Sequence, residues 1–168
     1  MDHTHRPDTK ATRLLDAHGA SYVVLPHTRP VYTVAEAAEQ RGVIAEEMVK
    51  SILLRESGSA GRYVMACVLG PDRLDHRAVR AHLPGPWARL TFAGDEEIRA
   101  VTGYPKGAVN PLALPSDVLI LFDEAIVHCR RVNISSGDLL AGLELDPADL
   151  IRVAGASLAP IAERDRGT

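Results

Sequence analysis

Apolar residues recur along the chain at two different spacings, which together predict helices interspersed with strands. Helices are predicted over residues 9–20, 33–43, 71–83, 95–103 and 146–155. Several of these segments carry residue types that favour helix ends. Such residues are Thr9 and Gly19, Thr33 with Glu36 and Gly42, Pro71, and Asp146 with Pro147.

Strands are predicted where short apolar runs are bounded by glycine, proline or polar clusters. These runs cover residues 21–27, 49–55, 61–70, 117–126 and 130–135, and residues 58–61 read as a flexible, hairpin-like loop between the second and third runs. Strands and helices alternate without a regular βαβ rhythm. The pattern therefore favours an α+β domain with a mixed sheet over a doubly wound fold.

Composition limits the classes of protein to consider. The chain has 168 residues, 46% of them hydrophobic and 24% charged, which suits one soluble domain. The formal net charge of −3 argues against broad, sequence-blind binding of nucleic acid, so no DNA partner is expected. Two cysteines, one in an apolar run, argue against a disulfide scaffold. No signal peptide and no membrane-length apolar stretch is found, which predicts a cytoplasmic protein without a membrane partner.

The predicted domain spans residues 10–163. Residues 1–9 read as a disordered tail, in which His3 and His5 are more often solvated than metal-bound, and residues 164–168 read as a frayed end. The chain lacks the strong signatures of a serine hydrolase, a P-loop enzyme or a zinc protease. No cofactor and no metal site is predicted.

Three features could carry chemistry. Lys50 lies in the run MVKSILL with apolar residues on both sides, so it either extends to solvent or points into a polar cavity. Residues 103–111 combine glycines and prolines in a loop whose free N–H groups could bind an oxygen-rich ligand. Residues 133–137, NISSG, form a second loop directly after a predicted strand, and a simple polar turn is the alternative interpretation.

Taken in order, the segments VVLPH, MVKSILL, TGYPKGAVNPLAL, NISSG and DPADLIRVAGA resemble the YbaK/prolyl-tRNA-synthetase-associated domain family. The resemblance covers roughly residues 10–163 and is most specific where Lys50 combines with the pattern Gly103, Gly107, Pro111. It implies a single compact domain with a strongly curved mixed sheet surrounded by helices. It also implies that the glycine–proline loop lines a pocket for the aminoacylated 3′ end of tRNA.

The implied function is free-standing hydrolysis of mischarged aminoacyl-tRNA, an editing reaction in translation quality control. The expected partner is the acceptor end of that tRNA, and an aminoacyl-tRNA synthetase is the second partner considered. The resemblance assigns catalysis to Lys50, through stabilisation of negative charge or as a neutral base. The substrate-binding residues that it implies are Ser51, Gly103, Gly107, Ala108, Val109, Asn110, Pro111, Ser135, Ser136 and Gly137.

Ser51, Lys106 and Asn110 depart from residues common in the family, which leaves alanine, cysteine, serine and threonine open as the amino acid removed. Arg73, Arg77 and Arg80 fall at i, i+4 and i+7 of the helix predicted over residues 71–83. They form a basic stripe that could contact tRNA phosphates or could be an ordinary solvated face. Two other functions stay open: a non-catalytic module for aminoacyl-tRNA ends, nucleotides or a synthetase, and a small-molecule hydrolase that ignores RNA.

Overall fold

The computed structural model describes residues 6–58 and 61–163. Its helices and strands follow one another as α1 (Lys10–Ala17), β1 (Tyr22–Pro26), α2 (Val34–Arg41), η1 (Ala45–Glu47), β2 (Val49–Glu56), β3 (Tyr63–Leu69), α3 (His76–Ala81), β4 (Leu90–Phe92), α4 (Asp95–Thr102), β5 (Leu119–Asp123), η2 (Glu124–His128), β6 (Val132–Ser135), β7 (Ala141–Leu145), α5 (Pro147–Ala154) and β8 (Ser157–Ala159). The α+β class predicted from the sequence is confirmed.

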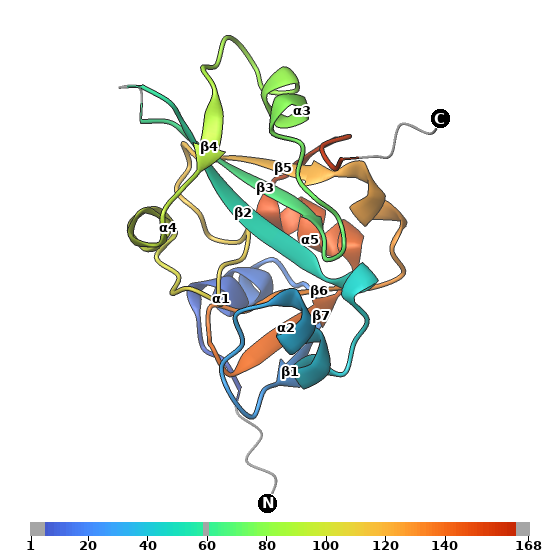
Figure 1. Cartoon of the computed structure of the whole chain (residues 1–168). Coiled ribbons are helices and arrows are strands. Elements are labelled where there is room, and N and C mark those ends of the chain that lie inside the picture. Colours follow the sequence, from blue (N-terminus) through green and yellow to red (C-terminus); the bar gives the residue numbers. More distant parts are fainter. Residues whose placement is uncertain (1–5, 59–60, 164–168) are drawn as a thin grey trace, which may run out of the picture.

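The strands form two sheets. The first is antiparallel with the order β1-β7-β6, and the second is mixed with the order β4-β2-β3-β5-β8. In the second sheet β2 pairs antiparallel with β3 and β4, whereas β3–β5 and β5–β8 are parallel. A parallel bridge between Met48, the residue before β2, and Asn133 of β6 links the two sheets. Figure 1 shows the smaller sheet with α1 and α2 at one end of the molecule and the larger sheet, with α3, at the other.

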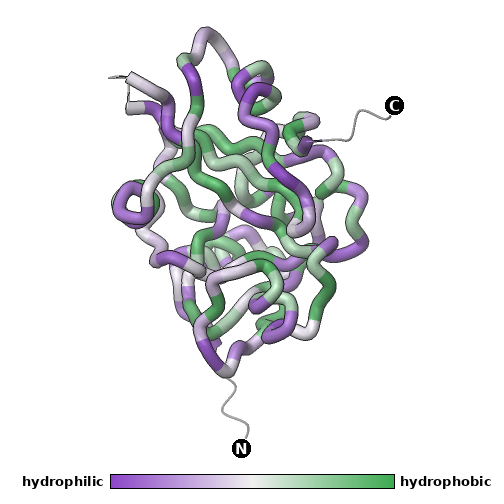
Figure 2. Tube along the Cα trace, in the orientation of Figure 1, coloured by the Kyte–Doolittle hydropathy of each residue, from purple (hydrophilic) through white to green (hydrophobic). Residues whose placement is uncertain are grey.

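The larger sheet is buried on both faces, which explains the long apolar runs of its central strands. Val49, Leu53 and Cys67 face a core shared with α1, α5 and the smaller sheet. Leu54 and Val64 face a second core that includes residues of α3 and β4. Figure 2 shows the same contrast, with hydrophobic colour along the central strands and hydrophilic colour on much of the outer chain. Among the described residues, no helix is both long and apolar enough to span a bilayer.

The predicted helix ends at α1, α2 and α5 are confirmed. At α2, the hydroxyl oxygen of Thr33 accepts a hydrogen bond from the Glu36 N–H at 3.1 Å, and Gly42 ends the helix with a φ of 67°. At α5, Asp146 accepts from the Ala148 N–H at 2.8 Å, and Pro147 occupies the first turn, where its missing N–H is not needed. These helix ends depend on interactions between neighbouring residues, so the sequence reveals them directly.

The helix predicted over residues 71–83 is wrong in its first turn. It begins only at His76, because Asp75 accepts hydrogen bonds from two N–H groups of α3 and acts as its N-cap. The preceding Leu74 instead forms a bridge with Ala162. Arg73 is therefore outside the helix, and the three-arginine stripe does not exist as one helix face.

Other differences concern strands formed by distant residues. Strands β4, β7 and β8 were not predicted, and residues 124–126, expected to extend β5, begin the 3-10 helix η2. Asp123 starts η2 by accepting a hydrogen bond from the Ala125 N–H at 3.1 Å. His3, His5 and the predicted frayed end at 164–168 lie outside the described residues, so the domain limits stay a prediction.

Candidate active site

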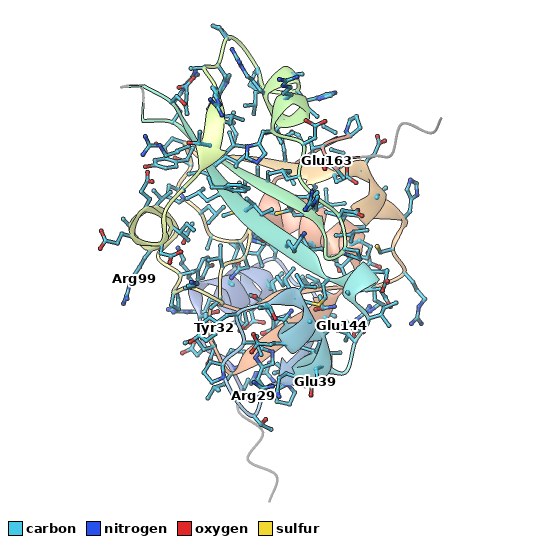
Figure 3. The ribbon with its side chains drawn as sticks, in the orientation of Figure 1. Arg29, Tyr32, Glu39, Arg99, Glu144 and Glu163 are labelled. Atoms are coloured by element: carbon cyan, nitrogen blue, oxygen red, sulfur yellow. The ribbon has the colours of Figure 1, made fainter. Side chains whose placement is uncertain are left out.

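A cavity of about 310 Å³ opens between the two sheets. Its walls come from the segment before α2, from α2 itself, from β2, from α4, from the loop at residues 103–111 and from the end of β6. Tyr32, which stands at this cavity on the segment before α2, is labelled in Figure 3. The cavity therefore gathers residues that are up to about a hundred positions apart in the sequence, from Val31 to Ser135.

The edge of β2 forms one wall of the cavity. Strand β4 pairs with β2 only from Leu54 to Glu56, so the earlier part of β2 has no strand partner on that side among the described residues. The Met48 carbonyl accepts from the Gly70 N–H, while the Leu53 carbonyl accepts from Ala93 on the other side. Because antiparallel bonding alternates along a strand, the Ser51 N–H and carbonyl point away from β3, toward this open edge.

Lys50 lies on this wall, so of the two alternatives that the sequence left open, solvent or a polar cavity, its position agrees with the second. Its side chain is half-buried, and its ammonium donates a hydrogen bond to the carbonyl oxygen of Asp72. Burial lowers the pKa of Lys50, and the nearby Asp72 carboxylate acts in the opposite direction. The structure thus presents a partly desolvated cation that has one neutral hydrogen-bond partner and room beside it.

The glycine–proline loop forms another wall of the cavity. Gly107 has a φ of 86°, and a Cβ there would lie 2.5 Å from the carbonyl oxygen of Val31. Only glycine fits, because both the conformation and the space exclude a side chain. The Ala108 N–H donates to the Pro105 carbonyl at 3.0 Å, whereas the N–H groups of Gly107 and Val109 donate to no other described residue.

The second predicted loop is tied to the first. The Ser135 hydroxyl donates to the Gly107 carbonyl at 3.4 Å, and the Gly137 N–H donates to the Ala108 carbonyl at 3.0 Å. The Ser136 hydroxyl is buried and donates to the Ala141 carbonyl at 2.6 Å. The NISSG segment therefore fixes the glycine–proline loop in place, and Ser135 alone of its two serines reaches the cavity.

The predicted site residues thus divide into two groups. Those that line the cavity are Lys50, Ser51, Gly107, Val109 and Ser135. Those that lie outside its lining are Gly103, Ala108, Asn110, Pro111, Ser136 and Gly137. Asn110 is fully buried and supports its own loop, since its side chain accepts from the Leu112 N–H and donates to the Ala108 carbonyl. Gly103 ends α4 with a φ of 76°.

The sequence interpretation missed Arg41, which also lines the cavity. It is the last residue of α2, and only 8% of it is exposed. A periodicity signal was present, because Val34, Ala37 and Arg41 share one helix face and the first two are apolar. Burial lowers the pKa of Arg41 to about 10, so it stays protonated at neutral pH.

The cavity carries a positive charge in a protein whose net charge is −3. Among the described lining residues, Arg41, Lys50 and Lys106 are cationic and Asp95 is the one carboxylate. Asp95 forms an exposed ion pair with Lys106, with 3.5 Å between nitrogen and oxygen. The unbalanced charge lies with Lys50 and Arg41, which favours a ligand that carries negative charge or develops it.

The described lining contains no histidine or cysteine, so no serine–histidine or cysteine–histidine pair is available there. The described residues also contain no group of three or more histidine, cysteine or acidic side chains arranged to hold a metal ion. Apart from the Lys106–Asp95 ion pair, the walls offer two cations, free backbone N–H groups and two serine hydroxyls. Such a set can bind an oxygen-rich group and stabilise an oxyanion.

A family model described as the aminoacyl-tRNA editing domain matches residues 28–153, which include every cavity wall described above. The chain belongs to this family. The resemblance inferred from the lysine and the glycine–proline loop is confirmed.

Known proteins similar to this editing domain include larger enzymes. The proline–tRNA ligase of Trichlorobacter lovleyi is 34% identical over 100 residues, which are 60% of this chain and 17% of the ligase. The chain thus spans less than a fifth of the length of this curated relative.

Two solved structures match the editing domain over their whole length. The hypothetical protein APE2540 has a TM-score of 0.81 and 30% identity, with 92% of this chain and 100% of that protein covered. A protein proposed to be a trans-editing enzyme for prolyl tRNA synthetase has a TM-score of 0.75 and 27% identity, with 95% and 100% covered. The fold therefore occurs in proteins of about this size.

Proposed function

We propose that this editing domain is a trans-acting aminoacyl-tRNA deacylase, which hydrolyses the ester between a wrong amino acid and the terminal ribose of tRNA. The observation that carries the proposal is the position of Lys50. It stands half-buried on the open edge of β2, in a cavity that the Gly107 loop also lines and that has unbalanced positive charge. The matches to two proteins of similar length support action as a separate protein.

The reaction needs an accurate second site because a single binding pocket discriminates weakly between amino acids of nearly equal size. Water attacks the ester carbonyl carbon, the carbonyl oxygen becomes an oxyanion, and the ribose hydroxyl leaves with a proton. The oxyanion can be stabilised by N–H groups that the protein has already oriented. The groups available for this are the N–H of Gly107, of Val109 and of Ser51 on the open edge of β2.

In addition to these N–H donors, Lys50 supplies a fixed positive charge beside the ester or the terminal phosphate. Its ammonium can move from the Asp72 carbonyl to a substrate oxygen, which is a stronger acceptor when it is charged. Since the described lining offers no histidine base, we assign the proton transfer to water and to the vicinal hydroxyl of the substrate ribose. This assignment explains why a Ser-His-Asp set is not required.

Contacts with the body of the tRNA are assigned to Arg73 and Arg77. Both are exposed, and Arg73 follows Asp72, the residue that Lys50 contacts, so this segment borders the cavity wall. Arg80, also predicted to bind tRNA, donates to the Trp87 carbonyl at 2.7 Å and so has a structural partner. Replacing Arg73 and Arg77 by glutamate should weaken tRNA binding and reduce its salt dependence. The hydrolysis of a small aminoacyl-nucleotide should change little.

The deciding experiment is a deacylation screen of the wild-type protein against tRNAs mischarged with different amino acids, repeated with Lys50→Ala. Hydrolysis of at least one mischarged tRNA by the wild type, lost in the variant, supports the deacylase. Salt-sensitive binding of aminoacyl-tRNA without hydrolysis favours a non-catalytic module. Hydrolysis of small esters without any tRNA affinity favours a small-molecule hydrolase.

A further inference from the structure

Arg41 is a buried cation that has only neutral partners. Its Nε donates to His27 Nε2 at 3.1 Å, its Nη1 to Asn133 Oδ1 at 2.9 Å and its Nη2 to the Ser135 hydroxyl at 3.2 Å. Within the described part of the chain it forms no ion pair. A guanidinium has five N–H donors, so two remain after these three bonds.

The position of this guanidinium is fixed from behind. It lies against Gly142 of β7, where a Cβ would be only 2.3 Å from Arg41 Nε and 2.7 Å from its Cζ. Strand β7 thus leaves just enough room for the flat group, and the three hydrogen bonds hold its edges. A further hydrogen-bond acceptor can reach Arg41 from the cavity, which Arg41 lines.

The cavity has an exposed rim and a buried inner end, and Arg41 belongs to the inner end. Tyr32 at the rim is 57% exposed, whereas Val31, Ala37 and Met48 are 5% exposed or less. These three apolar residues form one small cluster. The inner end therefore offers an apolar wall for a few carbon atoms, together with the polar group of Arg41 and Ser135.

A buried charge without a counter-ion is unfavourable unless a partner compensates it. Here burial lowers the pKa of Arg41 but leaves it charged at neutral pH. An incoming oxygen atom would accept hydrogen bonds from the unused N–H donors and so lower the cost of burying the charge. A hydrocarbon group of the same size would fill the space and leave the donors without a partner.

From this geometry we infer that Arg41 and Ser135 form a subsite for an oxygen atom on the side chain of the aminoacyl group. The inference rests on the proposed deacylase and specifies its substrate class. The preferred substrates carry a short side chain with an oxygen acceptor, either a hydroxyl or a carboxylate. Purely hydrocarbon side chains are hydrolysed more slowly: valine, which matches threonine in size, and alanine, which is serine without its oxygen.

The expected size of this preference follows from the cost of unpaired polar groups. A site built to hydrogen-bond a substrate group can reject the analogue that lacks it by several orders of magnitude. Because Arg41 keeps three protein partners, a smaller effect is expected, of at least about tenfold for seryl over alanyl ester and for threonyl over valyl ester.

The test uses one tRNA charged in turn with alanine, serine, valine, threonine and aspartate, and measures single-turnover hydrolysis. The wild type should favour each oxygen-bearing ester over its partner, and the aspartyl arm shows whether a carboxylate is preferred to a hydroxyl. In Arg41→Met, which keeps length but removes charge and donors, the preference should fall to within threefold. Arg152→Met, at an exposed arginine of α5 outside the cavity, is the matched control and should keep it.

Several outcomes would overturn the inference. A wild type without preference does so even if Arg41→Met fails to fold. A preference that survives in a folded Arg41→Met would also overturn the inference. If Arg41→Met slows the hydrolysis of all esters equally, Arg41 only supports β6 and the inference is again overturned. A second measurement separates failure of the subsite from failure of the proposed deacylase: the binding of minihelices that carry serine or alanine through an amide that cannot be hydrolysed. Tighter seryl binding without hydrolysis keeps the subsite and removes the enzyme, and equal binding without hydrolysis removes both.

Discussion

Replacing Lys50 by alanine should leave the fold almost unchanged. The variant loses a charged hydrogen bond to the Asp72 carbonyl, worth about 1.5–3 kcal/mol. It also removes the cost of holding a partly buried ammonium, whose pKa burial lowers. Because these effects oppose each other, we expect a net change within about 1 kcal/mol. That corresponds to a shift in Tm of about 2–4 °C for a domain of this size.

Activity should respond far more strongly. If Lys50 stabilises charge that develops only in the transition state, its loss should slow deacylation by on the order of 10²-fold or more. This corresponds to about 2.7 kcal/mol or more in the activation barrier. Lys50→Arg is informative only if activity is retained, because the larger guanidinium group keeps the charge but cannot act as a base. Retained activity there would favour charge stabilisation.

The assay is single-turnover hydrolysis of a mischarged tRNA, with circular dichroism to confirm folding. Lys10→Ala is the matched control, because Lys10 also donates to a backbone carbonyl, that of Thr102, and burial also lowers its pKa. Lys10 is outside the cavity lining, so its variant should stay within threefold of the wild-type rate. A Lys50→Ala rate within about threefold of wild type, roughly 0.7 kcal/mol, would refute a catalytic role for Lys50.

Three further predictions follow from buried or strained groups. Gly107→Val should reduce both thermal stability and deacylation, since its φ of 86° and a backbone oxygen 2.5 Å from the new Cβ both exclude it; wild-type Tm and rate would contradict this. Burial lowers the pKa of His27, and its Nε2 accepts from Arg41, so the folded state resists protonation. The unfolded state then binds more protons below about pH 6.5, and urea unfolding from pH 7 to 5 should show a loss of stability that is smaller in His27→Gln. Burial raises the pKa of Cys67 to about 12, so a thiol reagent at pH 8 should label Cys129 in the native protein and both cysteines only after unfolding, as mass spectrometry would show.

Local chemistry made parts of the fold predictable. Thr33 and Gly42 define the ends of α2 through a side-chain hydrogen bond and a left-handed backbone, both of which depend on neighbouring residues alone. The start of α3 was predicted wrongly because Pro71 was read as a first-turn residue, whereas Asp75 caps the helix. The bridge from Leu74 to Ala162, which no local pattern shows, keeps the earlier segment out of the helix.

The site was predictable only in part. Lys50 stood out because it interrupts an apolar run, and the glycine–proline loop because of its composition. Arg41 looked like an ordinary basic residue near a helix end, although its spacing from Ala37 placed it on the buried face. Its partners Asn133 and Ser135 are more than 90 positions away, so the sequence did not reveal what a charge on that face would meet.

The order of the smaller sheet determines when during synthesis the protein can fold. Strand β7 lies in the middle of β1-β7-β6, although it is the last of the three to leave the ribosome. Until it arrives, β1 and β6 have no partner in that sheet, and Arg41 has no backbone to lie against. Folding that depends on such distant pairing is slow and leaves strand edges exposed for longer. Chaperone contact with the nascent chain should therefore centre on β1, the earliest of these strands to wait for its partner.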